Sequence, residues 1–403
     1  MKKIFTVVLL FAFYSTVSVF SQEETNNKLL EKLVEKNILT KSEAEEILSE
    51  SEQESSTTKL EQTVEKVRNA FNTPYMQFGG YGLFWYRYNQ YENVHHDMNA
   101  RVVFISVRGQ LNKYFRYFIL ADFVNPQLYE FYGEWTPSTA FNLRAGQFKI
   151  PFSLENPFSL TDLETISNTR SVSYLVGMAG DPIQWSKMDG SAVNHTGRDV
   201  GVMASGSLLN IGTHDLIQYG AGVFQGTGMG VRENNSTKDF AGNIIVQPIK
   251  DLRIAGNLYA GKTSYRTSHR VLDVYPFKYP YTYQIDEEHG RNRWGLSGDY
   301  RNGGFYARSE WIKANDGGIK KEGLYGLAQY YVIPQKLSLL AKVDYLNIDK
   351  KNNNEVFDYV AGMDYYFWKK CRLQLNYIYS DYSKNWSQRS CENTVQLQMQ
   401  IAF

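Results

Sequence analysis

From residue 75 to the end of the chain, apolar and polar residues alternate with a period of two. In one such segment, Leu373 and Leu375 alternate with Arg372 and Gln374. Because successive side chains of a β-strand point to opposite faces, this period predicts strands with one apolar and one polar face. We count sixteen segments of this kind, at 75–90, 99–111, 113–122, 128–136, 140–149, 197–206, 213–225, 238–248, 251–261, 291–301, 303–313, 321–333, 336–347, 355–367, 371–382 and 392–403.

The connections between these segments alternate in length. Every second connection is in most cases a short turn, such as Asn112 alone or the pair Pro334-Gln335. In a bacterial outer-membrane barrel, short turns face the periplasm and longer loops face outside, whereas a soluble sandwich has no reason to sort its loops. The pattern predicts an all-β protein, a transmembrane 16-stranded antiparallel β-barrel over residues 73–403. The longer polar connections are 150–196, 226–237, 262–290, 348–354 and 383–391, and 123–127 is a short exception.

The polar face of the predicted strands carries both signs of charge, as Lys342 and Asp344 illustrate. Such a face is not a dry core, because an unpaired buried charge costs too much free energy. It fits a hydrated lumen, with the apolar face in contact with outer-membrane lipid. Aromatic residues near predicted strand ends, such as Tyr86, Trp135 and Trp311, fit the girdles at the two membrane interfaces.

Both ends of the chain carry signals for export. Lys2 and Lys3 precede a short apolar stretch at 4–14, which predicts a cleaved signal peptide at residues 1–21. The last nine residues, Val395–Phe403, alternate strictly and end on an aromatic residue, a pattern that resembles the assembly signal of outer-membrane barrels. We therefore expect the protein in the outer membrane of a Gram-negative bacterium.

Residues 22–72 are predicted to form a periplasmic helical segment and linker. Leu29, Leu33 and Val34 give an apolar stripe at helical spacing, and Thr40 with Glu43 resembles a capping box. The segment is interpreted either as a coiled segment that aligns oligomers or as a loosely ordered tether.

Composition and motifs exclude several functions. The chain has 43 Lys and Arg against 42 Asp and Glu, so nothing predicts a nucleic-acid partner. It has no nucleotide-binding glycine loop, zincin helix or Gly-x-Ser-x-Gly elbow, so we expect neither an enzyme nor a cofactor. His95, His96 and Asp97 lie on the first outward loop and lack a third fixed ligand, so we expect no metal site there.

The two cysteines are expected to remain unbridged. Cys371 starts a predicted strand at the periplasmic end, and Cys391 starts the next strand at the external end. They are therefore separated by much more than the roughly 7 Å that a disulfide allows between Cα atoms.

The long connection at 150–196 is a candidate constriction loop, since it is long enough to fold back into the barrel. The alternative is an external loop that lies over the rim. The run Gly146–Glu155, which reads GQFKIPFSLE and enters this connection, resembles the hallmark of the phosphate-selective porin O and P family. The segment Leu39–Glu45 is also similar to members of that family. The resemblance implies a homotrimeric porin that passes anions, in some members phosphate or polyphosphate, along pore-facing Arg and Lys side chains.

Strand parity and the loop supply candidate residues for this role. Arg guanidinium groups bind phosphate oxygens through paired charge-assisted hydrogen bonds, and rings of Arg or Lys favour anions in pores. Asp122, Glu130 and Glu134 share the same wall, so the alternatives are an anion-preferring pore and a weakly selective general pore. The candidate pore-lining, anion-interacting residues are Arg87, Arg108, Arg116, Arg144, Lys149, Arg170 and Lys187.

These observations predict a porin for passive diffusion of small hydrophilic solutes, with some preference for anions such as phosphate. The expected partners are outer-membrane lipid, small anionic or polar solutes and, from the resemblance, two further copies of the chain. The alternative is a non-conducting outer-membrane barrel with a binding or envelope-structural role, which would give no stepwise conductance in a planar bilayer.

Overall fold

The computed structural model describes residues 72–92, 95–176, 197–230, 235–264, 288–387 and 389–403. The predicted signal peptide and Lys187 lie outside the described residues, as does all of the predicted helical segment except Asn72. Pro74–Phe403 forms one compact unit, and everything below concerns this unit.

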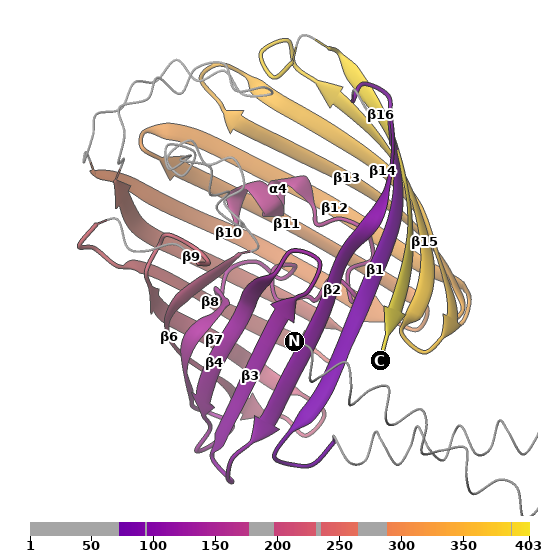
Figure 1. Ribbon diagram of the computed structural model, residues 1–403. Helices are drawn as coiled ribbons and strands as arrows, with labels where there is room; N and C mark the ends of the chain where they lie inside the picture. Colours follow the sequence, from indigo (N-terminus) through magenta and orange to yellow (C-terminus); the bar gives the residue numbers. More distant parts are fainter. Residues whose placement is uncertain (1–71, 93–94, 177–196, 231–234, 265–287, 388) are drawn as a thin grey trace, which may run out of the picture. The chain divides into compact units, whose positions relative to one another are not determined.

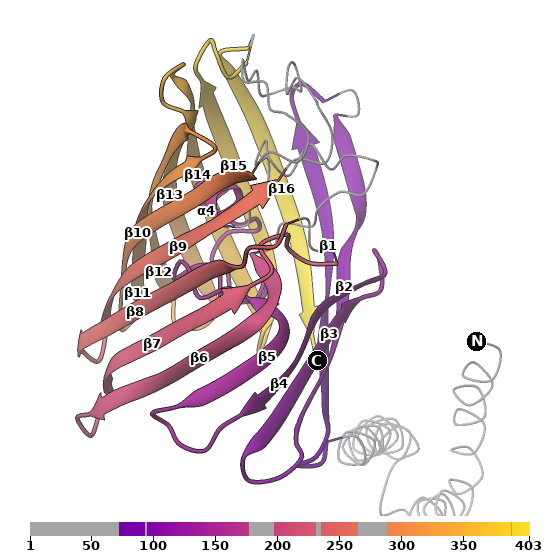
Figure 2. The same ribbon diagram turned by 90° about the vertical axis from the view of Figure 1, so that its left-hand side faces the viewer.

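Sixteen antiparallel strands close into a barrel, in which each strand pairs with its neighbours in sequence and β1 pairs with β16 (Figure 1). The predicted fold class is therefore confirmed. Figure 2 shows that β6, β7, β8 and β9 run obliquely across the wall, as closure of a barrel requires. The strands are β1 (Gln77–Asn89), β2 (His96–Gln110), β3 (Phe115–Asp122), β4 (Gln127–Trp135), β5 (Asn142–Lys149), β6 (Arg198–Asn210), β7 (Asp215–Phe224), β8 (Asp239–Ile249), β9 (Leu252–Ser264), β10 (Glu288–Asn302), β11 (Phe305–Asp316), β12 (Ile319–Ile333), β13 (Leu337–Asp349), β14 (Asn354–Trp368), β15 (Cys371–Tyr382) and β16 (Cys391–Ala402).

The outward connections after β11 and β13 are shorter than predicted. The one after β13, placed at 348–354, comprises only the four residues between Asp349 and Asn354. The sequence pattern ended a strand at residue 313 and began the next at 321, but β11 continues to Asp316 and β12 begins at Ile319. Gly317 and Gly318 close this hairpin with φ values of 60° and 91°. Positive φ at both central residues is what a two-residue hairpin turn demands, and glycine adopts it without steric cost. This outward connection is thus a second short exception.

The two faces of the strands follow the predicted parity. On β15, Leu375 is 39% exposed on the outer surface, whereas the neighbouring Gln374 is 1% exposed and points inward. The inner face is polar along most of β9–β16. Along β1–β4 it is partly apolar, since Leu83, Phe104 and Leu120 form a buried cluster there.

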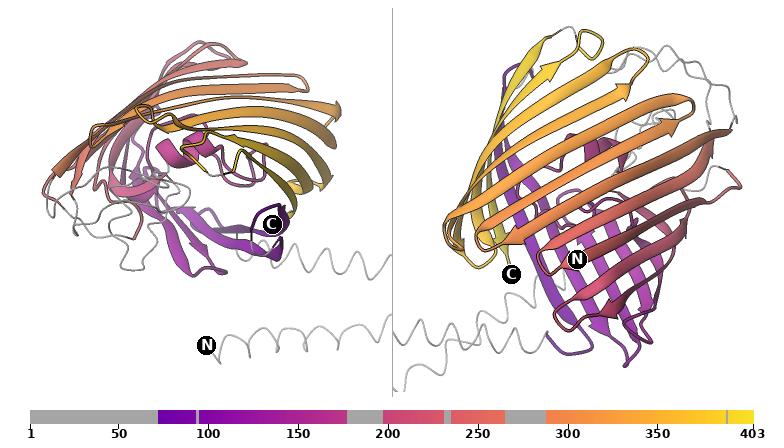
Figure 3. Two further views of the ribbon diagram at one scale, coloured as in Figure 1. Left: turned by 90° about the horizontal axis from the view of Figure 1, so that it is seen from above. Right: turned by 180° about the vertical axis from the view of Figure 1, so that it is seen from behind.

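The connection that follows β5 enters the barrel. Residues 150–176, here called the inner loop, include a one-turn helix, α4 (Arg170–Leu175), which packs against β11, β12 and β13. Seen from above, α4 lies within the ring of strands (Figure 3). In the described part of the chain, no helix is both long enough and apolar enough to cross a bilayer.

The cysteines and the histidine pair are placed largely as expected. The register pairs Cys391 with Asp381 and Arg372 with Gln400, so Cys371 and Cys391 lie at opposite ends of the β15–β16 ladder, and both are free thiols. His96 belongs to β2 rather than to the loop, and its ring hydrogen-bonds to the Tyr86 hydroxyl. The described residues include no cluster of three potential metal ligands.

Candidate functional site

The first half of the inner loop is anchored to Glu310 on β11. The Glu310 carboxylate accepts hydrogen bonds from the Ser153 hydroxyl and from the backbone amides of Leu154 and Glu155, each at 2.9 Å. Glu310 is 1% exposed. Alternation along β11 places this carboxylate inside the barrel. The inner loop supplies the hydrogen-bond donors that water would otherwise supply to it.

Arg308, two residues earlier on β11, forms the second anchor. Its guanidinium lies 3.1 Å from the Glu155 carboxylate and 2.8 Å from that of Glu164, and all three side chains are nearly fully buried. Burial raises the pKa of the Glu155 carboxyl, but Arg308, Lys342 and the hydrogen bonds from Thr169 outweigh it and hold the pKa below 4.5.

This lowered pKa predicts that docking of the inner loop depends on pH. A carboxyl whose pKa is lower in the docked state stabilises docking above pH 4.5, and that contribution is lost as pH falls below 4.5. We expect single-channel conductance to rise as the pH falls below 4.5 toward the lowered pKa of Glu155. The Glu155→Gln variant should conduct at the high level throughout, without a step. A wild-type conductance that does not change over this range would contradict the expectation.

The helix α4 and the segment before it are held by β13, β14 and β15. Arg170 donates to Asp358 at 2.5 and 2.9 Å, and Asp344 accepts the backbone amide of Arg170 at 2.6 Å. Arg372 donates to the carbonyl oxygen of Leu163 at 2.7 Å. Residues 150–176 therefore lie inside the barrel rather than over its rim.

The described residues enclose a larger and a smaller cavity inside the barrel. The larger, of about 1170 Å³, lies against β1–β5 and extends to Lys370 and Phe403 at the turn end; we call it the basic cavity. The smaller, of about 400 Å³, lies among the loop-side ends of β13–β16 and includes Glu92; we call it the outer cavity. Both cavities are bordered by Asn168 and Ser173 of the inner loop, which mark where a path from one to the other would pass.

Positive charge exceeds negative charge in the basic cavity. Three cations that line it have no carboxylate within ion-pair distance among the described residues: Arg101 donates to Ile166 and Gln398, Arg108 to Gln77, and Lys149 to the carbonyl oxygen of Phe158. The other three cations are paired, in the ion pairs Arg144–Glu134, Arg198–Glu130 and Lys370–Asp162.

The structure brings together three of the seven predicted residues, namely Arg108, Arg144 and Lys149, in the basic cavity. Arg87 and Arg170 border the outer cavity instead, where Glu92 and Asp358 neutralise them. Arg116 is exposed near the turn end of β3 and lines neither cavity, and Lys187 is not among the described residues.

Sequence reasoning missed Arg101 and Arg198. Strict alternation with Val103 directs residue 101 outward, but the β1–β2 register shifts between Leu83 and Phe84, which turns Arg101 inward. Arg198 is at the start of β6, where its guanidinium lies 2.7 Å from Glu130. A bulge leaves no signal in a pattern of period two, so the sequence offered no means of finding Arg101.

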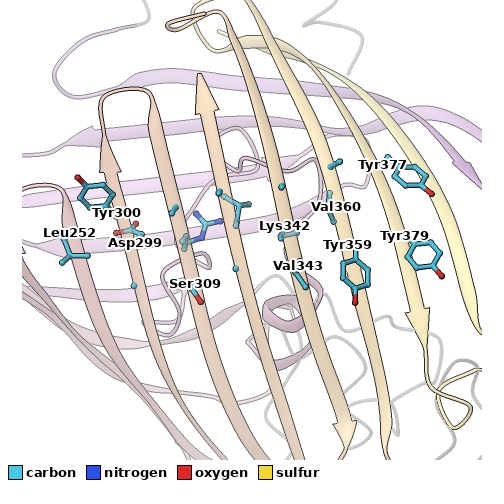
Figure 4. A pocket seen from close by; sticks show the side chains of 18 residues that line it. Leu252, Asp299, Tyr300, Ser309, Lys342, Val343, Tyr359, Val360, Tyr377 and Tyr379 are labelled. Atoms are coloured by element: carbon cyan, nitrogen blue, oxygen red, sulfur yellow. The ribbon is translucent and has the colours of Figure 1, made fainter. Parts of the chain in front are cut away.

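A third cavity, of about 790 Å³, lies outside the lumen. It is a groove on β10–β15 beside Val343, Tyr359 and Tyr377, which are 44–46% exposed on the outer face (Figure 4). The groove is on the lipid-facing surface. Small residues at the same height on neighbouring strands form its floor. They are Gly298, Ala307, Ser309, Gly326, Ala328, Ala341 and Ala361.

Comparison with known proteins finds other barrels of the same architecture. Residues 78–251 and 282–403 match the sequence profile of the family described as phosphate-selective porin O and P. An anion-selective porin from Comamonas acidovorans has a similar structure, with a TM-score of 0.59 and 12% identity over 81% of this chain and 99% of that one. OmpT of Vibrio cholerae in its trimer form gives 0.56 and 12%, over 81% and 99%. The channel DcaP of Acinetobacter baumannii gives 0.53 and 12%, over 81% and 97%.

These identities are low, so the structural likeness establishes the fold alone. A search of curated protein sequences finds no match for this chain.

Proposed function

Because the chain belongs to the phosphate-selective porin O and P family, and is an outer-membrane porin of a Gram-negative bacterium, we propose that it conducts small anions in preference to cations. The observation that carries the proposal is a set of three cations in the basic cavity, Arg101, Arg108 and Lys149, that form no ion pair with any carboxylate of the described ranges. Fixed positive charge along a narrow aqueous path raises the local concentration of anions and lowers that of cations. No chemical step is involved.

The inner loop sets the width of the path. It is anchored at Glu310, Arg308 and Asp358, and these contacts support the view that residues 150–176 hold a fixed constriction rather than a movable plug. The narrowest part is then at Asn168 and Ser173, which border both cavities. Conduction takes place between the inner loop and the inner face of β1–β5.

The test is conductance of the full-length protein in planar bilayers. The proposal expects stepwise insertion of open channels and, in a potassium chloride gradient, a reversal potential whose sign reports chloride as the more permeant ion. Silent bilayers from correctly folded, heat-modifiable protein would support a closed barrel with a binding or structural role. A reversal potential of zero or of the opposite sign would refute the anion preference.

We also propose a homotrimer that is formed through β3, β4 and β5. These strands have 8, 9 and 8 residues, against 15 in each of β10, β12 and β14. At about 3.3 Å per residue and a tilt of about 40°, eight residues rise only about 20 Å, less than the apolar band of about 25 Å. Neighbouring protomers would cover this low wall.

A pair of substitutions tests this interface. Phe131 on β4 is 55% exposed and Leu324 on β12 is 46% exposed, both on outward faces. Phe131→Asn and Leu324→Asn each place a polar group on the outer surface of the barrel. Only Phe131→Asn should convert the trimer band on unheated gels to monomer. Equal behaviour of the two variants would contradict the proposed interface.

A further inference from the structure

The wall of the basic cavity is apolar to an unexpected degree for a path that carries ions. Phe118 on β3 and Tyr132 on β4 line it side by side, with ring centroids 5.6 Å apart. Tyr81 on β1 lines it as well and packs edge-on against Phe104, at 5.2 Å. Tyr81, Phe118 and Tyr132 are half-buried, so part of each ring faces the cavity.

The inner loop adds apolar groups from the opposite side. Pro157, Phe158 and Leu160 line the same cavity, and Leu160 packs against the cluster formed by Leu83 and its neighbours. A solute in the basic cavity therefore lies between an aromatic strand surface and an apolar stretch of the loop. Such surfaces offer no hydrogen bonds to replace the hydration shell of a small inorganic ion.

The cations are set into this apolar surface. The guanidinium of Arg144 lies over the Tyr132 ring at 4.2 Å, and that of Arg198 lies over the Tyr129 ring at 5.3 Å. Arg101 lies over Trp85 at 5.0 Å. Arg144 and Arg198 are already paired with Glu134 and Glu130, whereas the printed hydrogen bonds of Arg101 use one terminal nitrogen only. Stacking holds the Arg101 guanidinium plane in place while its other nitrogens stay available for the two oxygens of a carboxylate.

We propose that the basic cavity binds organic anions in which a carboxylate is attached to an aromatic or branched apolar body, and prefers them to inorganic phosphate. The carboxylate pairs with Arg101 or Arg108, and the apolar body lies against Phe118, Tyr132 and Leu160. Orthophosphate gains the charge contact only, whereas the organic anion also removes apolar surface from water. This inference rests on the proposed anion-conducting function and names its solute class.

The experiment compares three anions as blockers of the chloride current through the trimer in planar bilayers: benzoate, acetate and orthophosphate. We expect benzoate to block at a concentration about tenfold below that of the other two, because only benzoate buries apolar area. Phe118→Ala should raise the half-blocking concentration of benzoate about fivefold and leave that of acetate unchanged. Arg101→Gln should raise the values for benzoate and acetate together.

Leu324→Ala is the control, since Leu324 is 46% exposed on the outer face of β12 and lies outside both the basic cavity and the proposed trimer interface. It should leave all three half-blocking concentrations unchanged. Equal block by benzoate and acetate, or strongest block by orthophosphate, in a channel that still prefers chloride to potassium would overturn the inference and leave the proposed function intact. Loss of the chloride preference itself would instead overturn the proposed function.

Discussion

Replacing Arg308 by Met is expected to release the inner loop from the barrel wall and to raise single-channel conductance. Arg308 is buried and pairs with Glu155 and Glu164, which are themselves 1% and 4% exposed. Removing one member of a buried ion pair leaves its partners charged and unpaired, at a cost of about 3–5 kcal/mol. The loop can avoid this cost by moving its two carboxylates into water, which widens the path. Conductance and melting temperature, measured on the same preparation, check the effect.

Lys313→Met is the control for this substitution. Lys313 is on the same strand but points outward, is 39% exposed and lies 3.8 Å from Glu322. An exposed pair of this kind contributes about 0–1 kcal/mol, so neither conductance nor stability should change noticeably. If Arg308→Met and Lys313→Met conduct alike, the anchoring of the loop through β11 is wrong. The double variant Glu155→Gln with Glu164→Gln should also open the path, because the loop then loses its charges while Arg308 remains.

Much of the barrel could be predicted because each strand contacts lipid on one side and polar groups on the other. Because the two faces of each strand meet different surroundings, segments such as Leu373 to Leu375 alternate between apolar and polar residues with a clear period of two. It also explains why the predicted number of strands agrees with the structure. The short Gly317-Gly318 hairpin was not predicted, because two glycines between polar residues do not mark where one strand ends and the next begins.

The lumen was less predictable, since it depends on contacts between residues far apart in sequence. Arg170 and Asp358 are 188 residues apart, and nothing in either segment indicates that the loop carries one to the other. Parity assigns a side chain to a face but does not say whether its charge is compensated. Arg87 and Arg170 were therefore predicted as anion-interacting residues, although each forms an ion pair in the structure.

The apolar part of the lumen could not be predicted for a different reason. Val102 and Phe104 on β2 point inward between Val103 and Ile105, which point outward. A run of consecutive apolar residues carries no period, so the sequence does not show which of its members face the pore. Only the register of β1 and β2, with its shift beside Leu83, resolves the two faces and brings Arg101 into the cavity.

The double variant Arg101→Gln with Arg108→Gln is expected to lose most of the preference for chloride over potassium. Both guanidinium groups line the basic cavity without a carboxylate partner in the described part of the chain, so their charge is available to a passing anion. A unit charge at about 4 Å contributes about 1 kcal/mol even in a water-like medium. That corresponds to about a fivefold change in the local concentration of a monovalent ion for each residue, in opposite directions for chloride and potassium.

The measurement is the reversal potential in a potassium chloride gradient, with Arg116→Gln as the control. Arg116 is an exposed arginine near the turn end of β3 that lines neither cavity, so its loss should shift the potential little. Glutamine removes the charge and keeps a polar side chain, although it is shorter than arginine, so pore width needs a separate measurement. Single-channel conductance in symmetric high salt should stay near the wild-type value in both variants, because screening there leaves width as the main determinant. If Arg116→Gln shifts the potential as much as the double variant does, selectivity arises from the overall charge of the barrel mouth, and the basic cavity is not the filter.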